Sequence, residues 1–527
     1  MCSTLRVSLV WVVPVVAAGL LVSAPEPAPA RGPDGLAKLI DEVIDGPDYK
    51  HASWGVLVVD AKTGKTVYAR NPDAMLAPAS VTKLFSCAAA LVAVGPDQKF
   101  ETVVFRRGPV QDSTLRGDLI LVASGDLTLG GRTDKDGHTV FKNNDHTYAS
   151  NGATEAELTD TDPLAGLDAL AKQVKDAGIT RIDGDVLIDD RLFARAHSSG
   201  SGPDAVTPIV VNDNVVDVII QPGTKPGDPA KVTTRPESAF YHVDALVSTT
   251  EAGSMPFVQV VATGPSQFAV RGEVPVGKPI VRICPTNEPA LFARALFIEA
   301  LRRHGVRAGA PLARPVETSL PPRDWYADAP KVASFTSPPF KDVIKVTLKV
   351  SHNLYASSLP CLVAVARGQS TIEAGLREER KILRRLDVDV SAVSFGGGAG
   401  GAPADHVSPR AVIQLLSGMA KRPEWAAFKD GLPVLGVDGT LASVVKEDSP
   451  ARGKVFAKTG TLTWYDAVNG RSFLRSKALG GVMTTKSGAT LYFAMIVNNV
   501  PLPLGVTATR EGTVLGRLCE ILYENGP

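Results

Sequence analysis

Residues 77–83 read Ala77-Pro78-Ala79-Ser80-Val81-Thr82-Lys83, and a run of small and apolar residues follows as far as Val94. A proline before such a run is typical of a helix that begins at about Val81. Lys83 then lies one turn after Ser80 on the same face of the helix, so that its amine can reach the serine hydroxyl. A serine beside a basic amine is a pattern of nucleophilic catalysis, and Ser80 is the candidate nucleophile.

A second Ser-x-x-Lys match, Ser443-Val444-Val445-Lys446, makes the spacing weak evidence when it is taken alone. This match runs into a polar stretch that ends at Pro450. We therefore expect a surface segment around Ser443 and the nucleophile at Ser80.

Two further motifs follow along the chain, Ser351-His352-Asn353 and Lys458-Thr459-Gly460-Thr461. Each has a structural alternative, because Ser and Asn are common helix N-caps and a Lys-Thr-Gly run also suits a strand that ends in a turn. The three motifs in this order are much rarer by chance than any one of them. Together they form the signature of penicillin-binding proteins and class A β-lactamases.

From about Leu36 to its C-terminus the chain resembles one family in particular. It is similar to the D-Ala-D-Ala carboxypeptidases and endopeptidases of the class C, low-molecular-mass penicillin-binding proteins, which are the S13 serine peptidases. That family carries its insertions between the first and second motifs, and the long gap between Ser80 and Ser351 leaves room for them here. Further matching segments are Gly117-Asp118-Leu119, Ser124-Gly125-Asp126, Gly184 to Asp189, Asn212-Asp213-Asn214 and Asp438-Gly439-Thr440-Leu441.

The resemblance and the chemistry of the side chains together imply catalytic roles. Ser80 would attack the carbonyl of the penultimate D-Ala and form an acyl-enzyme. Lys83 would accept the Ser80 proton, and the nearby charge of Lys458 would lower the pKa of Lys83. Ser351 would relay the proton to the leaving group, and Asn353 would hold Lys83 and the substrate amide.

The Lys-Thr-Gly motif would bind the substrate. Lys458 and Thr459 would bind the terminal carboxylate of the peptide. The resemblance also implies an oxyanion hole from the backbone N–H groups of Ser80 and Thr461, and such donors supply much of the rate enhancement in acyl transfer. Gly460 belongs to the same set of oxyanion and substrate-binding residues.

Asp189 and Phe193 are candidates for a second part of the substrate site. They stand where the family has residues that read the diamino-acid branch of the stem peptide. The alternative for the two residues is a strand end and a buried aromatic side chain. The motifs imply no metal and no cofactor.

The chain departs from the family in a glycine-rich segment. Where the family has an Asp-Gly-Ser-Gly-Leu-Ser-Arg-like run, residues 397–403 read Gly-Gly-Ala-Gly-Gly-Ala-Pro, so that Gly397 replaces the acid and Pro403 the arginine. His352 stands where the family often has Asp. We expect close backbone approach to survive at the glycines, whereas the recognition of substrate side chains is expected to differ.

The texture of the chain, meaning its pattern of expected helices and strands, changes along its length. Residues 35–103 and 331–527 show mixed helix and strand patterns, whereas residues 104–330 are dominated by strand-like runs between Gly and Pro. We expect a discontinuous catalytic domain around one or two inserted β-rich domains. With the resemblance, the predicted fold class is α/β, a penicillin-binding-protein/β-lactamase-like transpeptidase fold with an antiparallel sheet flanked by helices. Expected elements include strands over 215–221, 480–485 and 490–498, an apolar stretch over 354–359 broken by Pro360, and a closing helix over about 507–523.

Residues 1–30 have the pattern of a secretory signal peptide. An apolar run extends from Val7 to Ala24, and small residues at Ala28 and Ala30 fit an Ala-x-Ala cleavage site. The alternative is an uncleaved anchor that would associate the protein with the membrane. In both cases we expect the main body in the periplasm or another extracytoplasmic location.

The composition is that of a globular protein, with 44% hydrophobic and 21% charged residues and a formal net charge of +1. This balance gives no basic footprint for nucleic acid. The four cysteines after the apolar run are far apart and form no Cys-x-x-Cys pair, so a zinc site is not expected. One disulfide stays open without a defined pairing among Cys87, Cys284, Cys361 and Cys519.

The sequence thus predicts a serine DD-peptidase that removes the terminal D-Ala from peptidoglycan stem peptides and is acylated by β-lactams. Cleavage of D-Ala–diamino acid cross-links is a further activity that the resemblance allows. Two rivals stay open: a β-lactamase or esterase on the same fold, and a catalytically weak peptidoglycan-binding scaffold, which the altered glycine segment motivates. The long insertion argues against the first rival, and the intact set Ser80, Lys83, Ser351, Asn353 and Lys458 argues against the second.

Overall fold

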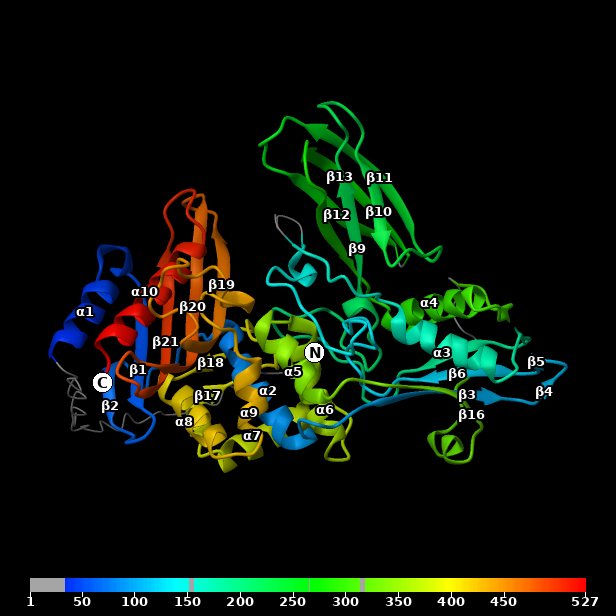
Figure 1. Ribbon diagram of the computed structural model, residues 1–527, viewed down its shortest axis with the longest axis horizontal. Coiled ribbons are helices and arrows are strands. Elements are labelled where there is room, and N and C mark those ends of the chain that lie inside the picture. The colour runs from blue at the N-terminus through cyan, green and yellow to red at the C-terminus, as the bar shows by residue number, and fades with distance from the viewer. Residues whose placement is uncertain (1–33, 151–155, 265, 313–317) are drawn as a thin grey trace, which may run out of the picture.

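The computed structural model describes residues 34–150, 156–264, 266–312 and 318–527, and the signal-peptide prediction therefore lies outside the described residues. An antiparallel sheet of five strands forms the centre of the left-hand part of the molecule in Figure 1. Its strands come from both ends of the chain. In spatial order they are β19 (Val455–Asp466), β20 (Arg471–Thr484), β21 (Thr490–Pro501), β1 (Ser53–Asp60) and β2 (Thr66–Arg70).

Strand β1 lies inside this sheet, between β2 and β21. Its register with β21 runs from Ser53 opposite Asn498 to Asp60 opposite Leu491. Residues Trp54–Val58 are all buried, so both faces of the strand are covered. A strand covered on both faces needs a continuous apolar run rather than an alternating one, and the sequence supplies it.

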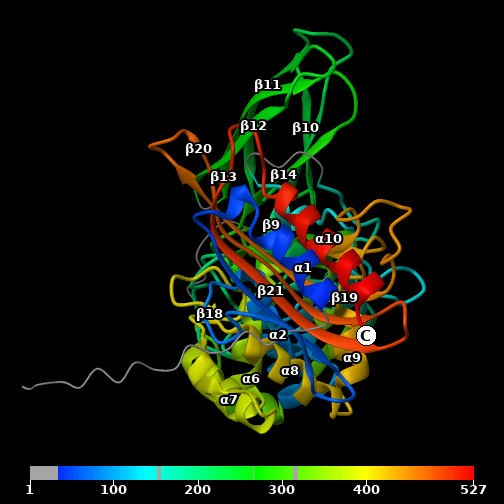
Figure 2. The ribbon, with the colours of Figure 1, turned by 90° about the vertical axis from the view of Figure 1, so that its left-hand side faces the viewer.

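Helices cover both faces of the sheet. One face carries α1 (Asp34–Ile44) and α10 (Thr509–Asn525), which lie side by side in front of the strands in Figure 2. Their apolar residues share a core with the strands. The other face packs against a larger helical layer. This layer contains α2 (Thr82–Val94), α5 (Phe340–Lys349), α6 (Asn353–Val365), α7 (Ile372–Arg385), α8 (Pro409–Ala420) and α9 (Trp425–Gly431).

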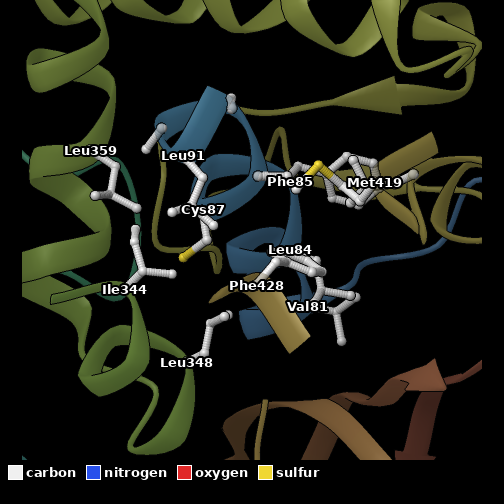
Figure 3. Packing of buried hydrophobic residues seen from close by; sticks show 14 of the residues in the cluster. Val81, Leu84, Phe85, Cys87, Leu91, Ile344, Leu348, Leu359, Met419 and Phe428 are labelled. Carbon is white, nitrogen blue, oxygen red and sulfur yellow. The ribbon is translucent and has the colours of Figure 1, made fainter. Parts of the chain in front are cut away.

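Helix α2 is buried on all sides at the centre of the helical layer (Figure 3). Leu84, Phe85 and Leu91 have no exposed surface and pack among apolar side chains of the neighbouring helices. A helix that is apolar all round belongs in the interior of a protein. It gives the residues at its N-terminus a rigid support.

The cysteines form no disulfide in the described part of the chain. All four are free and buried, so the disulfide that the sequence left open is not formed. Burial raises the pKa of each thiol, so each behaves as a small hydrophobic side chain. The residues are Cys87, Cys284, Cys361 and Cys519.

Helix α6 continues through Pro360, which corrects the expected break. A proline inside a helix has no N–H for the carbonyl four residues earlier, here that of Ala356. The glycine-rich segment lies against this carbonyl, because a Cβ on Gly398 would come within 2.0 Å of the Ala356 oxygen. On the other side α7 packs so closely that a Cβ on Gly375 would lie 1.8 Å from the Pro360 oxygen. Neighbouring backbone thus surrounds the interrupted turn and holds it helical.

The right-hand part of Figure 1 is built from the long segment between the first two motifs. A mixed four-stranded sheet and two helices share a second core there. The elements are β16 (Lys331–Thr336), β3 (Glu101–Arg107), β6 (Asp118–Val122), β8 (Val186–Asp189), α3 (Ala165–Asp176) and α4 (Pro289–Arg303). The predicted boundary at residues 103/104 falls inside β3, and the one at 330/331 lies directly before β16. These two strands pair with each other in this sheet, and the boundaries themselves stay a prediction.

Two three-stranded sheets project upward from this part in Figure 1. The first is β10 (Lys231–Arg235), β9 (Val215–Gln221) and β14 (Ile280–Pro285), and the second is β11 (His242–Thr250), β13 (Gln267–Pro275) and β12 (Phe257–Gly264). Short strands complete the structure: β4 (Val110–Gln111), β5 (Thr114–Leu115), β7 (Arg181–Ile182), β15 (Arg307–Ala308), β17 (Val393–Ser394) and β18 (His406–Val407). Within the described ranges, none of the helices is long and apolar enough to cross a membrane.

Candidate active site

Ser80 stands in a tight turn immediately before α2. The turn is a 3-10 helix over Ala79–Val81, closed by a 3.1 Å hydrogen bond from the Val81 N–H to the Pro78 carbonyl. Ala79 has a φ of +47°, in the left-handed region that a residue with a Cβ rarely adopts. Such local strain clusters at functional sites. Here the strained residue directly precedes a serine that lines a cleft.

Lys83 is fully buried one turn after Ser80. Its Nζ lies 2.9 Å from Ser80 Oγ, 2.8 Å from Asn353 Oδ1 and 2.6 Å from the carbonyl oxygen of Ala399. Burial lowers the pKa of Lys83 to about 7, since the charged ammonium loses its hydration. A large share of Lys83 is therefore neutral at pH 7, with a lone pair that can accept the Ser80 proton.

Ser351 and Lys458 form a second pair beside the first. Lys458 Nζ is buried and donates to Ser351 Oγ at 2.9 Å and to the Thr459 carbonyl at 2.8 Å. Burial and the neighbouring charge of Lys83 hold the pKa of Lys458 well below its ordinary value. Ser351 has a φ of +63°, and its carbonyl accepts a 2.5 Å hydrogen bond from the Tyr148 hydroxyl. The Ser351 hydroxyl is thus held against an amine that readily gives up a proton.

Gly460 lets strand β19 run directly beside the Ser80 turn. A Cβ at this position would lie 2.3 Å from the Pro78 oxygen and 3.3 Å from the Ala79 Cβ, so only glycine allows the approach. β19 is the edge strand of the sheet, and Thr461 and Ser80 both line the same cleft. The oxyanion hole from their backbone N–H groups stays a prediction that this arrangement suits.

The residues of the three motifs meet at a cleft of about 690 Å³. The catalytic side contributes Ser80, Ser351, Asn353, Thr459 and Thr461, which the sequence predicted. Another part of the lining comes from the inserted segment, which no motif had pointed to. Its lining residues there include Asn143, Asn144, Tyr148 and Glu157.

Comparison with known proteins identifies the protein family in which such a site occurs. The family model of D-Ala-D-Ala carboxypeptidase 3 (S13) matches residues 36–514. The chain belongs to this family. Membership confirms the predicted enzyme class, a serine D-Ala-D-Ala carboxypeptidase.

Relatives of this S13 enzyme match over most of their length. A D-alanyl-D-alanine carboxypeptidase of Actinomadura sp. (strain R39) is 29% identical over 497 residues, which cover 88% of this chain and 84% of that protein. A carboxypeptidase DacB of Mycolicibacterium smegmatis is 24% identical, with coverage of 94% and 85%. The crystal structure of penicillin binding protein 4 (dacB) from Haemophilus influenzae superposes with a TM-score of 0.69 at 20% identity, over 92% of this chain and 99% of that one. The likeness confirms the predicted fold class.

In this S13 enzyme the altered glycine segment supports Lys83. The carbonyl of Ala399 accepts from Lys83 Nζ, and the carbonyl of Gly398 accepts from Ser86 Oγ at 2.9 Å. A Cβ on Gly400 would lie 2.2 Å from the Ala79 oxygen, so the segment also packs against the nucleophile turn. The expectation of close backbone approach therefore describes this segment well. Its carbonyl contact to Lys83 could not be found from the sequence, because any residue has a carbonyl group.

Asp189 and Phe193 do not join the other predicted site residues at the cleft. Asp189 ends β8, where its carboxylate accepts from Arg191 at 2.6 Å and from the Tyr326 hydroxyl at 2.7 Å. Phe193 is 2% exposed and belongs to the hydrophobic core. Their places match the alternative of a strand end and a buried aromatic, because the acid is already paired and the ring is covered.

Ser443 has the surface setting expected from its sequence. It is exposed in a turn at the margin of the cleft, and Lys446 is exposed as well. Since no helix joins the two residues, the lysine is not placed one turn above the serine. The two Ser-x-x-Lys matches differ in structure just as their contexts suggested.

His352, rather than Ser351 or Asn353, caps helix α6, and it makes a further contact. Its Nδ1 accepts from the Tyr355 N–H at 3.3 Å and caps α6, and its ring stacks on that of Tyr355. On the other side lies Asp213 of the insertion, 3.3 Å from His352 Nε2 and 2.5 Å from the Tyr355 hydroxyl. The other oxygen of Asp213 accepts from Arg132 at 2.7 Å. The Asn212-Asp213-Asn214 segment had been noticed in the sequence, without a role.

A further group with metal-ligand atoms lies outside the cleft lining. Within the described residues it is the one set of three such side chains that converge, Asp134, Asp136 and His138. The Asp134 carboxylate accepts from the backbone N–H groups of the other two residues, at 3.0 and 2.8 Å. These bonds close a surface turn, which accounts for the cluster without an ion.

Proposed function

We propose that Ser80 is the nucleophile of this carboxypeptidase and that Lys83 is its base. One observation carries the proposal: Lys83 Nζ lies 2.9 Å from Ser80 Oγ in a site whose burial lowers the pKa of the lysine to about 7. A hydrogen bond of this length allows direct proton transfer, and a pKa near the working pH suits a general base.

The first half-reaction forms an acyl-enzyme. Ser80 Oγ attacks the carbonyl carbon of the penultimate D-Ala while its proton passes to Lys83 Nζ. The C–N bond to the terminal D-Ala then breaks, and the leaving amine takes a proton through the Ser351 hydroxyl. Lys458, which contacts that hydroxyl at 2.9 Å, replaces the proton. In the second half-reaction water attacks the ester and gives its proton through the Ser351 hydroxyl to the neutral Lys458, while Lys83 returns its proton to Ser80 Oγ. The shortened peptide and free Ser80 are released, and both lysines regain their starting protonation.

The substrates proposed are peptidoglycan stem peptides that end in D-Ala-D-Ala. The family to which the chain belongs supports this choice. β-Lactams are proposed as acylating inhibitors, since they present a strained amide to the same serine. In support, the penicillin binding protein 4 of Haemophilus influenzae has been solved as a complex with a β-lactam.

A fluorescent penicillin tests the proposal. The wild-type chain should retain the label through denaturing electrophoresis, and Ser80→Ala should abolish it. Ser443→Ala is the matched control, because it removes the serine of the other Ser-x-x-Lys match and should leave labelling intact. Rapid loss of the label with release of opened penicillin would support a β-lactamase instead. A wild-type chain that takes no label would support the non-catalytic scaffold.

An extracytoplasmic location is part of the proposal. It is supported by the signal-like pattern of residues 1–30 and by the location of peptidoglycan outside the inner membrane. Mass spectrometry of the mature N-terminus after cell fractionation tests it. Cleavage after Ala30 indicates a released protein, an intact N-terminus in the membrane fraction indicates an anchor, and a full-length cytoplasmic protein contradicts the proposal.

A further inference from the structure

The terminal carboxylate of the substrate needs a cation in the cleft, and Lys458 is not placed to be that cation. Its side chain is fully buried, and its Nζ donates to Ser351 Oγ and to the Thr459 carbonyl. It does not line the cleft, and neither does Lys83. The role expected for Lys458 in binding the carboxylate therefore falls to another residue.

Lys477 on β20 is the one lysine or arginine among the described residues that line the cleft. It lies directly opposite Thr461 of β19 in the antiparallel register. Residues paired in this way point to the same face of a sheet. Lys477 Nζ donates to Thr461 Oγ1 at 2.9 Å. Thr459, two residues along β19, shares this face, so two hydroxyls and one ammonium gather at the edge nearest Ser80.

The ammonium group of Lys477 is not paired with a carboxylate among the described residues. Among the described residues it forms no ion pair, and the acid that most affects it is Glu511 of α10. That carboxylate already accepts from the Tyr49 hydroxyl at 2.5 Å and from Arg510 Nε at 2.7 Å. Burial lowers the pKa of Lys477 to about 8, as is usual for an ammonium that lacks a counter-ion.

The surroundings leave space in front of this amine. Gly512 of α10 lines the cleft beside it, and even a Cβ there would stay 3.5 Å from Lys477 Nζ. The Asp145 carboxylate, which also lines the cleft, is paired with Arg132 at 2.8 Å, so it does not compete for Lys477. A carboxylate that enters the cleft thus meets a cation with free hydrogen-bonding capacity.

We propose that Lys477 binds the carboxylate on the carbon that carries the leaving amine of the peptide, with the hydroxyls of Thr459 and Thr461 beside it. The inference rests on the proposed function and assigns the substrate class more closely. Substrates have a free carboxylate at the leaving residue, whether it is a terminal D-Ala or a cross-linked diamino acid. Lys458 is left to the proton relay through Ser351.

A pair of peptides that differ only at their end tests the inference. The rate of D-Ala or D-alaninamide release is measured for a peptide that ends in D-Ala-D-Ala and for the same peptide that ends in D-Ala-D-alaninamide. The wild type should prefer the free acid by about 10- to 100-fold in kcat/KM, the usual range for one charge-assisted hydrogen bond. Lys477→Met should lose most of this preference through slower cleavage of the acid, and Lys477→Arg should restore it.

Lys486→Met is the control, because Lys486 is exposed just after β20, away from the cleft lining, and its variant should keep the wild-type preference. A Lys477→Met enzyme that still prefers the acid as strongly as the wild type would overturn the inference. Failure of the proposed function has a different signature, since the wild type would then cleave neither peptide and Ser80 would take no penicillin label.

Discussion

At the residue scale, the site depends on two buried lysines with different tasks. The sequence predicted that the charge of Lys458 lowers the pKa of Lys83. In the structure, burial is the first cause of the lowered pKa at both lysines, and the repulsion between their charges adds to it at Lys458. The motif residues were predictable because the catalytic chemistry needs these residue types at these separations in the sequence. The carbonyl of Ala399 and the cation Lys477 were not, since neither belongs to a motif and only the fold brings them to the site.

The rate of Ser80 acylation should depend on the protonation of Lys83. Below pH 7 the ammonium form predominates and cannot accept the Ser80 proton, so acylation by penicillin should rise with pH and reach half its maximum near pH 7. Lys83→Arg, which stays charged, should lose about 10²–10⁴-fold of the rate. Stopped-flow labelling between pH 5 and 9 measures both effects. A flat profile for the wild type would contradict the role of Lys83 as the base.

Glu379 should make stability depend on pH in the opposite direction from an ordinary surface acid. Burial in α7 and the nearby Asp405 raise the pKa of Glu379 to about 8. The folded chain therefore keeps a proton that the unfolded chain loses above its ordinary pKa of 4.5, and the free energy of unfolding falls as the pH rises from 4.5 to 8. Glu379→Gln should remove this loss and stabilise the protein at pH 8.5 by about 1–3 kcal/mol.

Urea unfolding at pH 5 and pH 8.5 checks the prediction for Glu379. The variant and the wild type should have similar midpoints at pH 5 and separate at pH 8.5. Glu378→Gln is the matched control, since this neighbour is partly exposed and pairs with Lys381. An equal effect of the two substitutions would show that burial at Glu379 is not the cause.

At the element scale, strands with a clear alternation or a continuous apolar run were predicted well. The expected strand over 215–221 coincides with β9, whereas the expected strand over 480–485 is only the end of β20 (Arg471–Thr484). The β19–β20 hairpin extends beyond the core, where exposed Trp464 and Tyr465 give no inside-outside pattern to read. The break expected at Pro360 was wrong for a related reason. The backbone that packs around this turn belongs to other segments, which the local sequence does not reveal.

The glycine segment gives a prediction about close approach. Gly400 and Gly488 have φ values of +90° and +91°, so alanine brings similar backbone strain at both positions. Only at Gly400 would the new Cβ also clash, 2.2 Å from the Ala79 oxygen, whereas nothing lies within 4 Å at Gly488. Gly400→Ala should therefore lower the free energy of unfolding by about 1–3 kcal/mol more than Gly488→Ala.

Gly400→Ala should also slow the labelling of Ser80 by penicillin, because the clash is with the turn that carries the nucleophile. Gly488→Ala should label at the wild-type rate. Equal labelling by the two variants would mean that the segment does not hold the nucleophile turn.

At the scale of the whole molecule, the insertion is part of the active site. It supplies part of the cleft lining, its Tyr148 contacts Ser351, and its Asp213 contacts Tyr355 at the start of α6. The sequence separated the inserted block from the catalytic parts by texture alone. Texture reflects local periodicity and cannot show that buried hydrogen bonds join the two parts.

Asp213→Asn should uncouple the insertion from that loop. The change leaves Arg132 with one buried carboxylate instead of two, and such a loss costs about 3–5 kcal/mol of stability. Acylation per folded molecule should fall at least about 10-fold, because the hydrogen bond that holds Tyr355 at the start of α6 is weakened. Asp183→Asn, which breaks a surface pair with Arg116, should change neither property. Unaltered acylation in folded Asp213→Asn would show that the contact is not used in catalysis.

The pairing of Asp60 with Leu491 also has a consequence for folding while the chain is being synthesised. Ribosomes add about 5–20 residues per second, so β1 waits tens of seconds for β21, its neighbour in the finished sheet. During that time one edge of an apolar strand is open, and open edges pair readily with other chains. A chain that is released before residue 490 lacks β21, so that edge of β1 stays unpaired permanently. Premature termination should therefore yield aggregates rather than a smaller, partly working enzyme.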